Sequence, residues 1–578
     1  GLYHQQYSYT GVKADGATNG SVDGTISAIT TTIPGQSVIT STYGYNDLRQ
    51  LTSKGVTVPD QNGTQTKVYD RSYTYDRIAV DSGNWMGTRL ASTGYTFGSS
   101  SRSFTYTYDD AGNIKSVMAS DSAGMLYDYD GLGQLVKETP IGLTMYAVTY
   151  AYDTAGNIRS ITRGGTTLKS FGYTNPSWPD LLTSVTANGT TKDVLYEGQS
   201  RTSDLPSSGN PVTYYNGRDY HFDWSKGRQL TEAVVGGQTV KYAYDMSGVR
   251  SSKQVGDTTY TYTTLSGKVM RQQWGNKSLE FVYDDGNQPF AMIYKHGSTA
   301  ELYYYLVNAQ GDVAAILDSS GTMVASYNYG AWGSCTVYNS SDAAIGDLNP
   351  LRYRGYYYDA ETGFYYLQSR YYDPAICRFI NADGLFTDGF VGSNLFTYCV
   401  NDPVNTVDPT GNFAITATVA LITFGIALVA TALAVGISSS PGFQEAVGGL
   451  CESVGDIAEQ IEEKLTNSFA KIKKPPNYRS NKEVHHIVAQ RAPGAAPAQK
   501  ILADLEIGID EPVNKVSIST CLHRRLHTKL YYELVNVVIA GAYNSAGGDR
   551  EQQIENVTSA LKAIRSFIFV LDRTTPKF

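Results

Sequence analysis

The chain has 578 residues, more than one hydrophobic core can organise, so several domains are expected. It holds 46 Tyr and 57 Gly with only 17% charged residues, a composition typical of a large β-rich body with many tight turns. The 5 cysteines include no CxxC pair, which excludes a zinc site of that pattern and gives no disulfide framework.

The net charge of −8 conceals two parts of opposite sign. Residues 471–578 contain 16 Lys and Arg against 10 Asp and Glu, a net charge of +6, so the preceding 470 residues carry −14. A basic segment on an acidic body fits a domain that binds a polyanion and is kept from it until release. A solvated basic face would give the same count, so that alternative stays open.

Residues 1–345 repeat a loose unit of alternating aromatic and polar residues, an Asp, a Gly turn and a second short strand. Its clearest copies span 106–114, 127–135, 150–158 and 242–249. Period-two alternation around such a turn predicts β-hairpins, and a repeat near twenty residues predicts hairpins stacked into a long sheet. The units resemble the YD repeats of Rhs proteins and of the C components of bacterial toxin complexes. That resemblance implies a hollow β shell enclosing the C-terminal segment, with the Tyr ring packed and the Asp capping its turn.

The next stretch, 346–412, contains LRYRGYYYDAETGFYYLQSRYYDP and ends in DPVNTVDPTG. It resembles the Rhs-associated core, which plugs the shell in relatives. The resemblance implies that Asp383 and Asp408 cut the chain just beyond the final Asp-Pro-Thr-Gly. Two carboxylates sharing a site take different pKa values, so one can act as base and the other as acid on a water. The first motif reads Asp383-Gly-Leu-Phe instead of Asp-Pro-x-Gly, so a turn-forming role for both aspartates stays open.

Residues 413–437 form 25 consecutive positions without a charge. A helix of about 20 apolar residues crosses a bilayer, so this stretch is long enough. Three interpretations stay open: a permanent membrane anchor, a helix packed inside the shell, and a segment that contacts a target membrane transiently. Residues 444–466 show apolar positions at helical spacing, and Pro475-Pro476 marks a linker.

Four of the 7 histidines lie within the 43 residues from His485 to His527. Glu483–His486 and Asn514–Thr520 are predicted strands, and 523–535 is a predicted helix. On that helix His523 and His527 are four residues apart and share one face. Three imidazole ligands that leave one coordination position open are typical of a catalytic metal site, and a fourth imidazole can accept a proton.

The spacing of His-His, Asn and His-x3-His resembles the HNH, or ββα-metal, nuclease superfamily. Within it, residues 480–540 resemble the toxin family named for its Ala-His-His motif, with Val484 in place of Ala. The resemblance implies a DNA-cleaving domain with one divalent metal ion, either Zn²⁺, Ni²⁺, Mg²⁺ or Mn²⁺. The implied metal ligands are His485, His523 and His527.

The resemblance also implies roles around the metal. His486 would be the general base, Asn514 would aim it through hydrogen bonds, and Glu483 would orient a nearby basic side chain. The candidate phosphate contacts are Lys482, Arg524, Arg525 and Lys529.

We therefore expect a mainly β protein: a shell at 1–345, a core at 346–412, a hydrophobic helix and amphipathic connector at 413–474, and a small α+β nuclease at 475–578. The opening Gly-Leu-Tyr, without an initiator Met, indicates a piece of a longer polypeptide. The expected function is a secreted antibacterial toxin whose nuclease acts in the cytoplasm of a competing cell, with a cognate immunity protein as partner. Two alternatives stay open. The same toxin could act on RNA, or the chain could be a cell-surface carbohydrate-binding or adhesion protein whose metal-bound tail is structural, with Glu483 or Asp510 as fourth ligand.

Overall fold

The computed structural model describes most of the first 411 residues and part of the C-terminal region. The described residues are 2–9, 26–46, 50–59, 63–80, 83–265, 267–340, 344–383, 394–411, 415–416, 482–490, 495–510, 512–519, and 535, 536, 539, 543, 550, 551, 553, 554, 557, 558, 560–562, 564 and 565. The chain divides into two compact units. The first holds residues 1–6, 29–386 and 392–421, and the second holds 7–28, 387–391 and 422–578.

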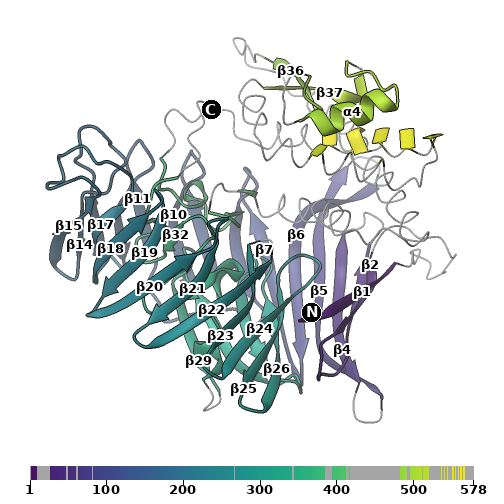
Figure 1. Ribbon diagram of the computed structural model, residues 1–578. Helices are drawn as coiled ribbons and strands as arrows, with labels where there is room; N and C mark the ends of the chain where they lie inside the picture. Colours follow the sequence, from purple (N-terminus) through teal and green to yellow (C-terminus); the bar gives the residue numbers. More distant parts are fainter. Residues whose placement is uncertain are drawn as a thin grey trace. The chain divides into compact units, whose positions relative to one another are not determined.

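Two large sheets dominate the first unit, and in each the strands follow one another in chain order (Figure 1). The 15-stranded sheet comprises β1 (His4–Tyr9), β2 (Ile26–Thr32), β3 (Ile39–Tyr45), β4 (Leu51–Pro59), β5 (Gln65–Val80), β6 (Gly83–Phe97), β7 (Ser100–Tyr108), β8 (Ile114–Ala119), β9 (Gly124–Tyr129), β10 (Leu135–Ile141), β11 (Val148–Tyr152), β12 (Ile158–Arg163), β13 (Thr166–Gly172), β14 (Ser184–Ala187) and β15 (Thr190–Asp193).

The 14-stranded sheet comprises β16 (Leu195–Tyr196), β17 (Pro211–Tyr215), β18 (Asp219–Ser225), β19 (Gln229–Val235), β20 (Gln238–Tyr244), β21 (Arg250–Val255), β22 (Thr258–Leu265), β23 (Lys268–Trp274), β24 (Lys277–Tyr283), β25 (Pro289–His296), β26 (Thr299–Val307), β27 (Val313–Leu317), β28 (Met323–Tyr329) and β29 (Cys335–Asn339). Neighbouring strands whose register is resolved run antiparallel, as between β20 and β21. The stacked hairpins predicted from the repeats are therefore confirmed.

In the four clearest copies of the repeat, the turn is closed by its own aspartate. In the turn between β7 and β8, Asp109 Oδ1 accepts the backbone N–H of Asn113 at 2.8 Å, and its Oδ2 accepts the Asn113 amide at 3.0 Å. The second tyrosine of a unit reaches back one hairpin: Tyr129 donates its hydroxyl to Ile114 O at 2.8 Å, and Tyr152 to Leu135 O at 2.6 Å. The Asp therefore fixes the turn and the Tyr fixes the spacing between hairpins, which is why the two recur together.

The predicted core, 346–412, forms a compact aromatic body. Its four-stranded sheet comprises β30 (Tyr357–Asp359), β31 (Phe364–Tyr366), β32 (Tyr371–Asp373) and β33 (Arg378–Phe379), in that order. Short elements flank it: α1 (Ile345–Leu348), η1 (Tyr353–Gly355), η2 (Cys399–Asn401), and the pair β34 (Thr406–Val407) and β35 (Ile415–Thr416). Buried side chains of this sheet, including Phe364 and Tyr372, belong to one apolar cluster with residues of both large sheets.

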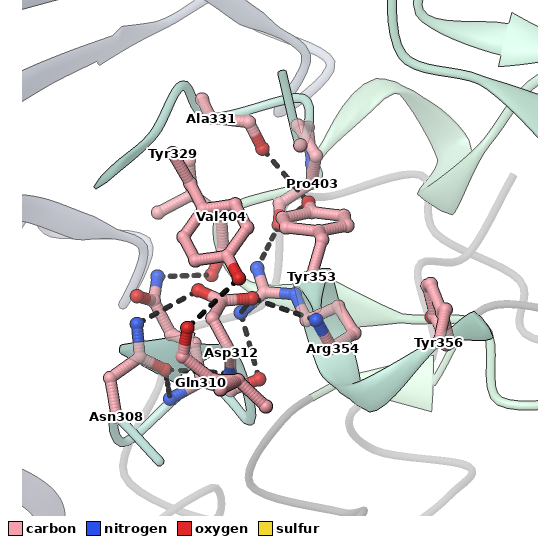
Figure 2. A network of polar contacts seen from close by, with 12 residues as sticks. Asn308, Gln310, Asp312, Tyr329, Ala331, Tyr353, Arg354, Tyr356, Pro403 and Val404 are labelled. Carbon is pink, nitrogen blue, oxygen red and sulfur yellow. Dashed lines mark hydrogen bonds and ion pairs between the residues drawn. The ribbon is translucent and has the colours of Figure 1, made fainter. Parts of the chain in front are cut away.

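Arg354 ties the core to a turn of the second sheet (Figure 2). Its guanidinium donates to Gln310 O at 2.8 Å and to the carbonyl of Pro403, and its backbone N–H donates to Asp312 Oδ1 at 2.9 Å. Figure 2 shows the side chain lying beside the ring of Tyr353. This buried arginine joins the turn after β26 to the chain just before Asp408.

In the second unit, β36 (Lys482–His486) pairs antiparallel with β37 (Lys515–Ser519). Between them lie α4 (Ala496–Asp504) and η4 (Pro512–Asn514). Ile487, Val488 and Leu502 are buried in one apolar cluster with Val535 and Ile539, which brings the hairpin region and the later helical residues into one small core.

The uncharged stretch 413–437 lies outside the described residues apart from Ile415–Thr416, which form β35 rather than a helix. Among the residues that the structure describes, no helix is long and apolar enough to cross a membrane.

Candidate functional site

The β36–β37 hairpin carries the predicted His-His doublet. Its register pairs His485 with Val516 and His486 with Lys515, so the doublet lies at the end of β36 beside the start of β37. Both strands agree with the sequence prediction to within one residue at each end. The central Asn514 immediately precedes β37 and therefore lies next to the doublet's end of the hairpin.

Asn514 is fully buried, and its side-chain amide holds two loops at once. Its Oδ1 accepts the Val488 N–H at 2.8 Å, and its Nδ2 donates to Val488 O at 3.2 Å and to Ile509 O at 2.8 Å. Its backbone carbonyl accepts the Ile487 N–H at 2.9 Å. These bonds fix the segment that leaves His486 to the segment that enters β37.

His486 contacts a carboxylate that the sequence assigned to another role. Its Nε2 lies 3.0 Å from Asp510 Oδ1, which also accepts from Gln490 Nε2 at 2.9 Å and Lys515 Nζ at 2.8 Å. The hydrogen bonds from Lys515 and His486 lower the pKa of the Asp510 carboxyl. From the sequence, Asp510 is expected only as a possible fourth metal ligand. Asn514 donates to Ile509 O, in the residue before Asp510, and no sequence spacing reveals this contact.

The other residues predicted for this site are described only in part. Lys482, Glu483 and His485 are placed as backbone positions of β36. The rest, His523, His527, Arg524, Arg525 and Lys529, lie outside the described residues. Within the described part of the chain, no three His, Cys, Asp or Glu side chains gather as a metal site.

The core brings its two predicted aspartates together around one arginine. Arg370 Nη2 lies 2.9 Å from Asp383 Oδ2 and 3.4 Å from Asp408 Oδ2. All three side chains are largely buried, with 3%, 13% and 2% of the Arg370, Asp383 and Asp408 side chains exposed. The Arg370 guanidinium contacts both Asp383 and Asp408 and offsets the repulsion between their carboxylates, so the predicted pair differs from two carboxylates that share a site alone.

The surroundings hold this group rigidly. Asp408 donates its backbone N–H to the Tyr356 hydroxyl at 3.0 Å, and Asp383 donates its own to Leu395 O at 2.9 Å. Burial lowers the pKa of Arg370 to about 10, against the opposing effect of the two carboxylates, so the guanidinium stays protonated at neutral pH.

The sequence analysis did not single out Arg370, the partner of both aspartates. The available signal was an arginine inside the aromatic run Tyr365–Tyr372, where a charge is costly to bury unless it is paired.

Two family profiles match the chain. The Teneurin YD-shell family matches residues 21–404. A nuclease family of the HNH/ENDO VII superfamily with conserved AHH matches residues 466–568.

Curated relatives match in part. The tRNA nuclease WapA of Bacillus subtilis (strain 168) is 34% identical over 209 residues, which is 34% of this chain and 8% of WapA. The double-stranded DNA deaminase toxin A of Burkholderia cenocepacia is 35% identical over 112 residues, 19% of this chain and 8% of that toxin. The chain thus spans less than a tenth of these relatives. Among solved structures, the TcdB2-TccC3-TEV crystal structure is similar with a TM-score of 0.45 and 19% identity, covering 69% of this chain and 21% of the other.

Proposed function

Because the chain belongs to the Teneurin YD-shell family and carries an AHH nuclease domain, we propose that it is part of a secreted toxin whose C-terminal domain hydrolyses DNA in a competing cell. In this proposal the β shell at 1–345 and its core at 346–412 carry the nuclease at 475–578. The nuclease profile favours this over an adhesion protein, for which a metal-bound tail would be structural only.

The observation that carries the proposal is the set of hydrogen bonds made by the Asn514 side chain. A fully buried amide with three side-chain hydrogen bonds holds the segment next to His486. Positioning of this kind is what a general base needs, because proton transfer depends on the placement of the ring.

In the proposed reaction His486 takes a proton from the attacking water. Asp510, 3.0 Å from Nε2, would favour the protonated ring once the proton has moved. Glu483 orients a nearby basic side chain. Lys482, Arg524, Arg525 and Lys529 contact phosphates of the nucleic acid backbone.

The donor set suits a single divalent ion, since His485, His523 and His527 are imidazoles and HNH nucleases are generally metal-dependent. When bound, the ion supplies Lewis-acid stabilisation of the charge on the phosphate. Zn²⁺, Ni²⁺, Mg²⁺ and Mn²⁺ are the candidates.

The substrate is proposed as DNA, with RNA as the alternative. WapA is named a tRNA nuclease, which supports the RNA alternative, although the match covers 8% of that protein. A nuclease toxin also requires protection of its producer. We therefore propose an acidic immunity protein that covers the net +6 segment 471–578. For residues 413–437 we propose a transient contact with the target membrane.

The test uses the full chain on supercoiled plasmid and on tRNA, with each divalent ion added separately. Wild type is expected to cut plasmid, and His486→Ala to be slower by about 10²–10⁴-fold. His221→Ala is the matched control, because His221 is exposed on β18 in the shell. Full activity of His486→Ala would reject the assigned base, and cutting of tRNA alone would reject DNA as substrate. No cutting of either substrate with any ion would reject the nuclease.

A second activity, self-cleavage in the core, is proposed because Asp383 and Asp408 meet at Arg370. The chain expressed intact is expected to separate into two fragments near Gly411. Asp408→Asn and Asp383→Asn should remain whole on a denaturing gel. Cleavage of both variants at the wild-type rate would exclude the two aspartates.

A further inference from the structure

We propose that a cavity between the second large sheet and the core binds a small tetrahedral oxyanion, of which inorganic phosphate is the simplest, through Arg250 and Lys268. Residues of β21–β24 line the cavity on one side and residues of the core line it on the other. Neither cation takes part in the nuclease reaction or the self-cleavage proposed above. The inference is therefore independent of both activities.

The two cations lie at the same end of the second sheet, where β21–β24 follow one another (Figure 1). Arg250 is the first residue of β21 and Lys268 is the first residue of β23. The strand between them, β22, runs antiparallel to both and ends at Leu265. Because β21 and β23 start at the same edge, both side chains reach one wall of the cavity.

The size of the cavity limits what it can hold. Its volume is about 50 Å³. A buried water needs roughly 10–15 Å³, so there is room for about three to five waters, or for one ion with the dimensions of phosphate. A nucleotide or a sugar would not fit inside, although a single phosphate group of a larger molecule would.

Both cations have donors left for an anion. Arg250 uses Nη1 for Asp359, while its Nη2 has no hydrogen-bond partner among the described residues, although the side chain is only 1% exposed. The rings of Tyr357 and Tyr366 lie 4.8 and 4.4 Å from its Cζ and hold the guanidinium in place without supplying an oxygen. Lys268 donates to Asn287 O at 3.0 Å, which uses one of its three protons. A phosphate oxygen is the acceptor that such donors bind most strongly.

The charge at this wall is not balanced. The described residues that line the cavity include no Asp or Glu, and Lys268 makes no ion pair in the described part of the chain. Asp359 already balances Arg250, and Asp284, whose charge acts on Lys268, is bound to Lys54 at 2.6 Å. Burial lowers the pKa of Lys268 to about 8, and the attraction of Asp284 offsets this only in part. A bound anion supplies the missing negative charge and favours the protonated amine.

The core contributes a wall of its own through Gln368. A Cβ at Gly267, in the turn between β22 and β23, would overlap the side-chain amide of Gln368, so the amide lies directly against the backbone of that turn. Gly267 also has a φ of +78°, which a larger residue adopts only with strain. The amide can thus donate to the same anion that Arg250 and Lys268 bind. The anion then joins the sheet to the core, and it stabilises the folded chain by mass action.

The experiment titrates the full chain with inorganic phosphate in a calorimeter, with chloride keeping the ionic strength constant. Lys268→Gln removes the charge, and Lys277→Gln is the matched control, because Lys277 is exposed on the neighbouring strand β24. Urea unfolding without phosphate reports whether each variant folds as the wild type does. A parallel titration with glycerol 3-phosphate distinguishes a free ion from the phosphate group of an ester.

A second measurement needs no variant. Lysines of the wild-type chain are acetylated with an active ester, with and without phosphate, and the rate at each lysine is followed by mass spectrometry. At ten times the dissociation constant, phosphate should slow the acetylation of Lys268 by about 10-fold and leave that of Lys277 unchanged.

One phosphate per chain is expected to bind to the wild type and to Lys277→Gln. Loss of a charged donor should weaken binding to Lys268→Gln by about 10–100-fold. Binding of free phosphate alone would assign a free ion to the cavity, and equal binding of glycerol 3-phosphate would assign a phosphate group whose ester remains in solvent. The absence of saturable binding by both compounds would overturn the inference. So would equal affinity in a folded Lys268→Gln, or an unchanged acetylation rate of Lys268 at saturating phosphate.

Discussion

Loss of Asp359 should weaken the attachment of the core to the shell. It lies in β30 and contacts Arg250 Nη1 and, at 3.1 Å, Lys253 Nζ, both on β21. The exposed fractions of the Asp359, Arg250 and Lys253 side chains are 0%, 1% and 5%. Removing one partner of a buried pair leaves an uncompensated charge and costs about 3–5 kcal/mol. Asp359→Asn should therefore lower the free energy of unfolding by about that amount.

A matched exposed pair gives the comparison. Asp219 and Lys192 lie 2.6 Å apart, but their side chains are 67% and 42% exposed. Asp219→Asn makes the same chemical change where water already screens the charges, so it should cost about 0–1 kcal/mol. Urea unfolding followed by tyrosine and tryptophan fluorescence measures both variants. Equal midpoints for the two would refute the argument that burial of the ion pair holds the core.

The same pair predicts a pH dependence. Burial acts to raise the pKa of Asp359, but Arg250 and Lys253 outweigh it and hold the pKa below its usual value. A carboxyl with a lowered folded-state pKa stabilises the fold above its unfolded pKa of about 3.9, and the contribution is lost as pH falls through the folded value. The stability difference between wild type and Asp359→Asn should thus be full near neutral pH and shrink below about pH 4.

Three further outcomes are expected. Val400 has a left-handed φ of 52°, which is strained for a β-branched residue, and its side chain is 71% exposed. Val400→Gly should therefore raise the free energy of unfolding by about 1 kcal/mol and raise the urea midpoint. Val407→Gly, in the extended strand β34, should lower the midpoint. Asn514→Asp keeps the acceptor for the Val488 N–H but replaces the Nδ2 donor with an oxygen, which is repelled by the carbonyl oxygens of Val488 and Ile509. Plasmid nicking should therefore fall by about 10–100-fold. A chelator should abolish nicking and one added divalent ion should restore it; an unchanged rate would contradict metal dependence.

The repeat body was predictable because its determinants are local. Alternation of side chains and the Asp-x-x-Gly turn lie within one hairpin, so residues 106–114 contain most of what forms β7, the turn and β8. The same holds for β36 and β37, whose apolar and β-branched residues mark them as strands.

The contacts that join the core to the shell, and those that join the two large sheets, were not predictable, because their partners are far apart in sequence. Arg250 and Asp359 are separated by 109 residues, and Lys54 and Asp284 by 230. Lys54 and Arg250 lie in strands, and the alternation of side chains does not decide whether the charge at such a position is solvated or buried. Only the packed structure shows that these positions face carboxylates.

Two side-chain amides, each four residues after a repeat Asp, explain how a regular shell can hold an irregular core. Gln134 donates its Nε2 to Asp130 in its own turn and accepts Asn401 Nδ2 at 2.8 Å with its Oε1. Asn157 likewise donates to Asp153 and accepts from Asn394. A side-chain amide has a donor and an acceptor, so capping the turn uses one end and leaves the other for the core. Along the chain, Asn394 and Asn401 lie between Asp383 and Asp408, the two aspartates that contact Arg370. The turns of two repeats therefore hold Asn394 and Asn401, which lie in the described part of the chain between those aspartates. A change of Gln134 to a residue without an acceptor should therefore slow the proposed self-cleavage, although Gln134 contacts neither aspartate of the pair.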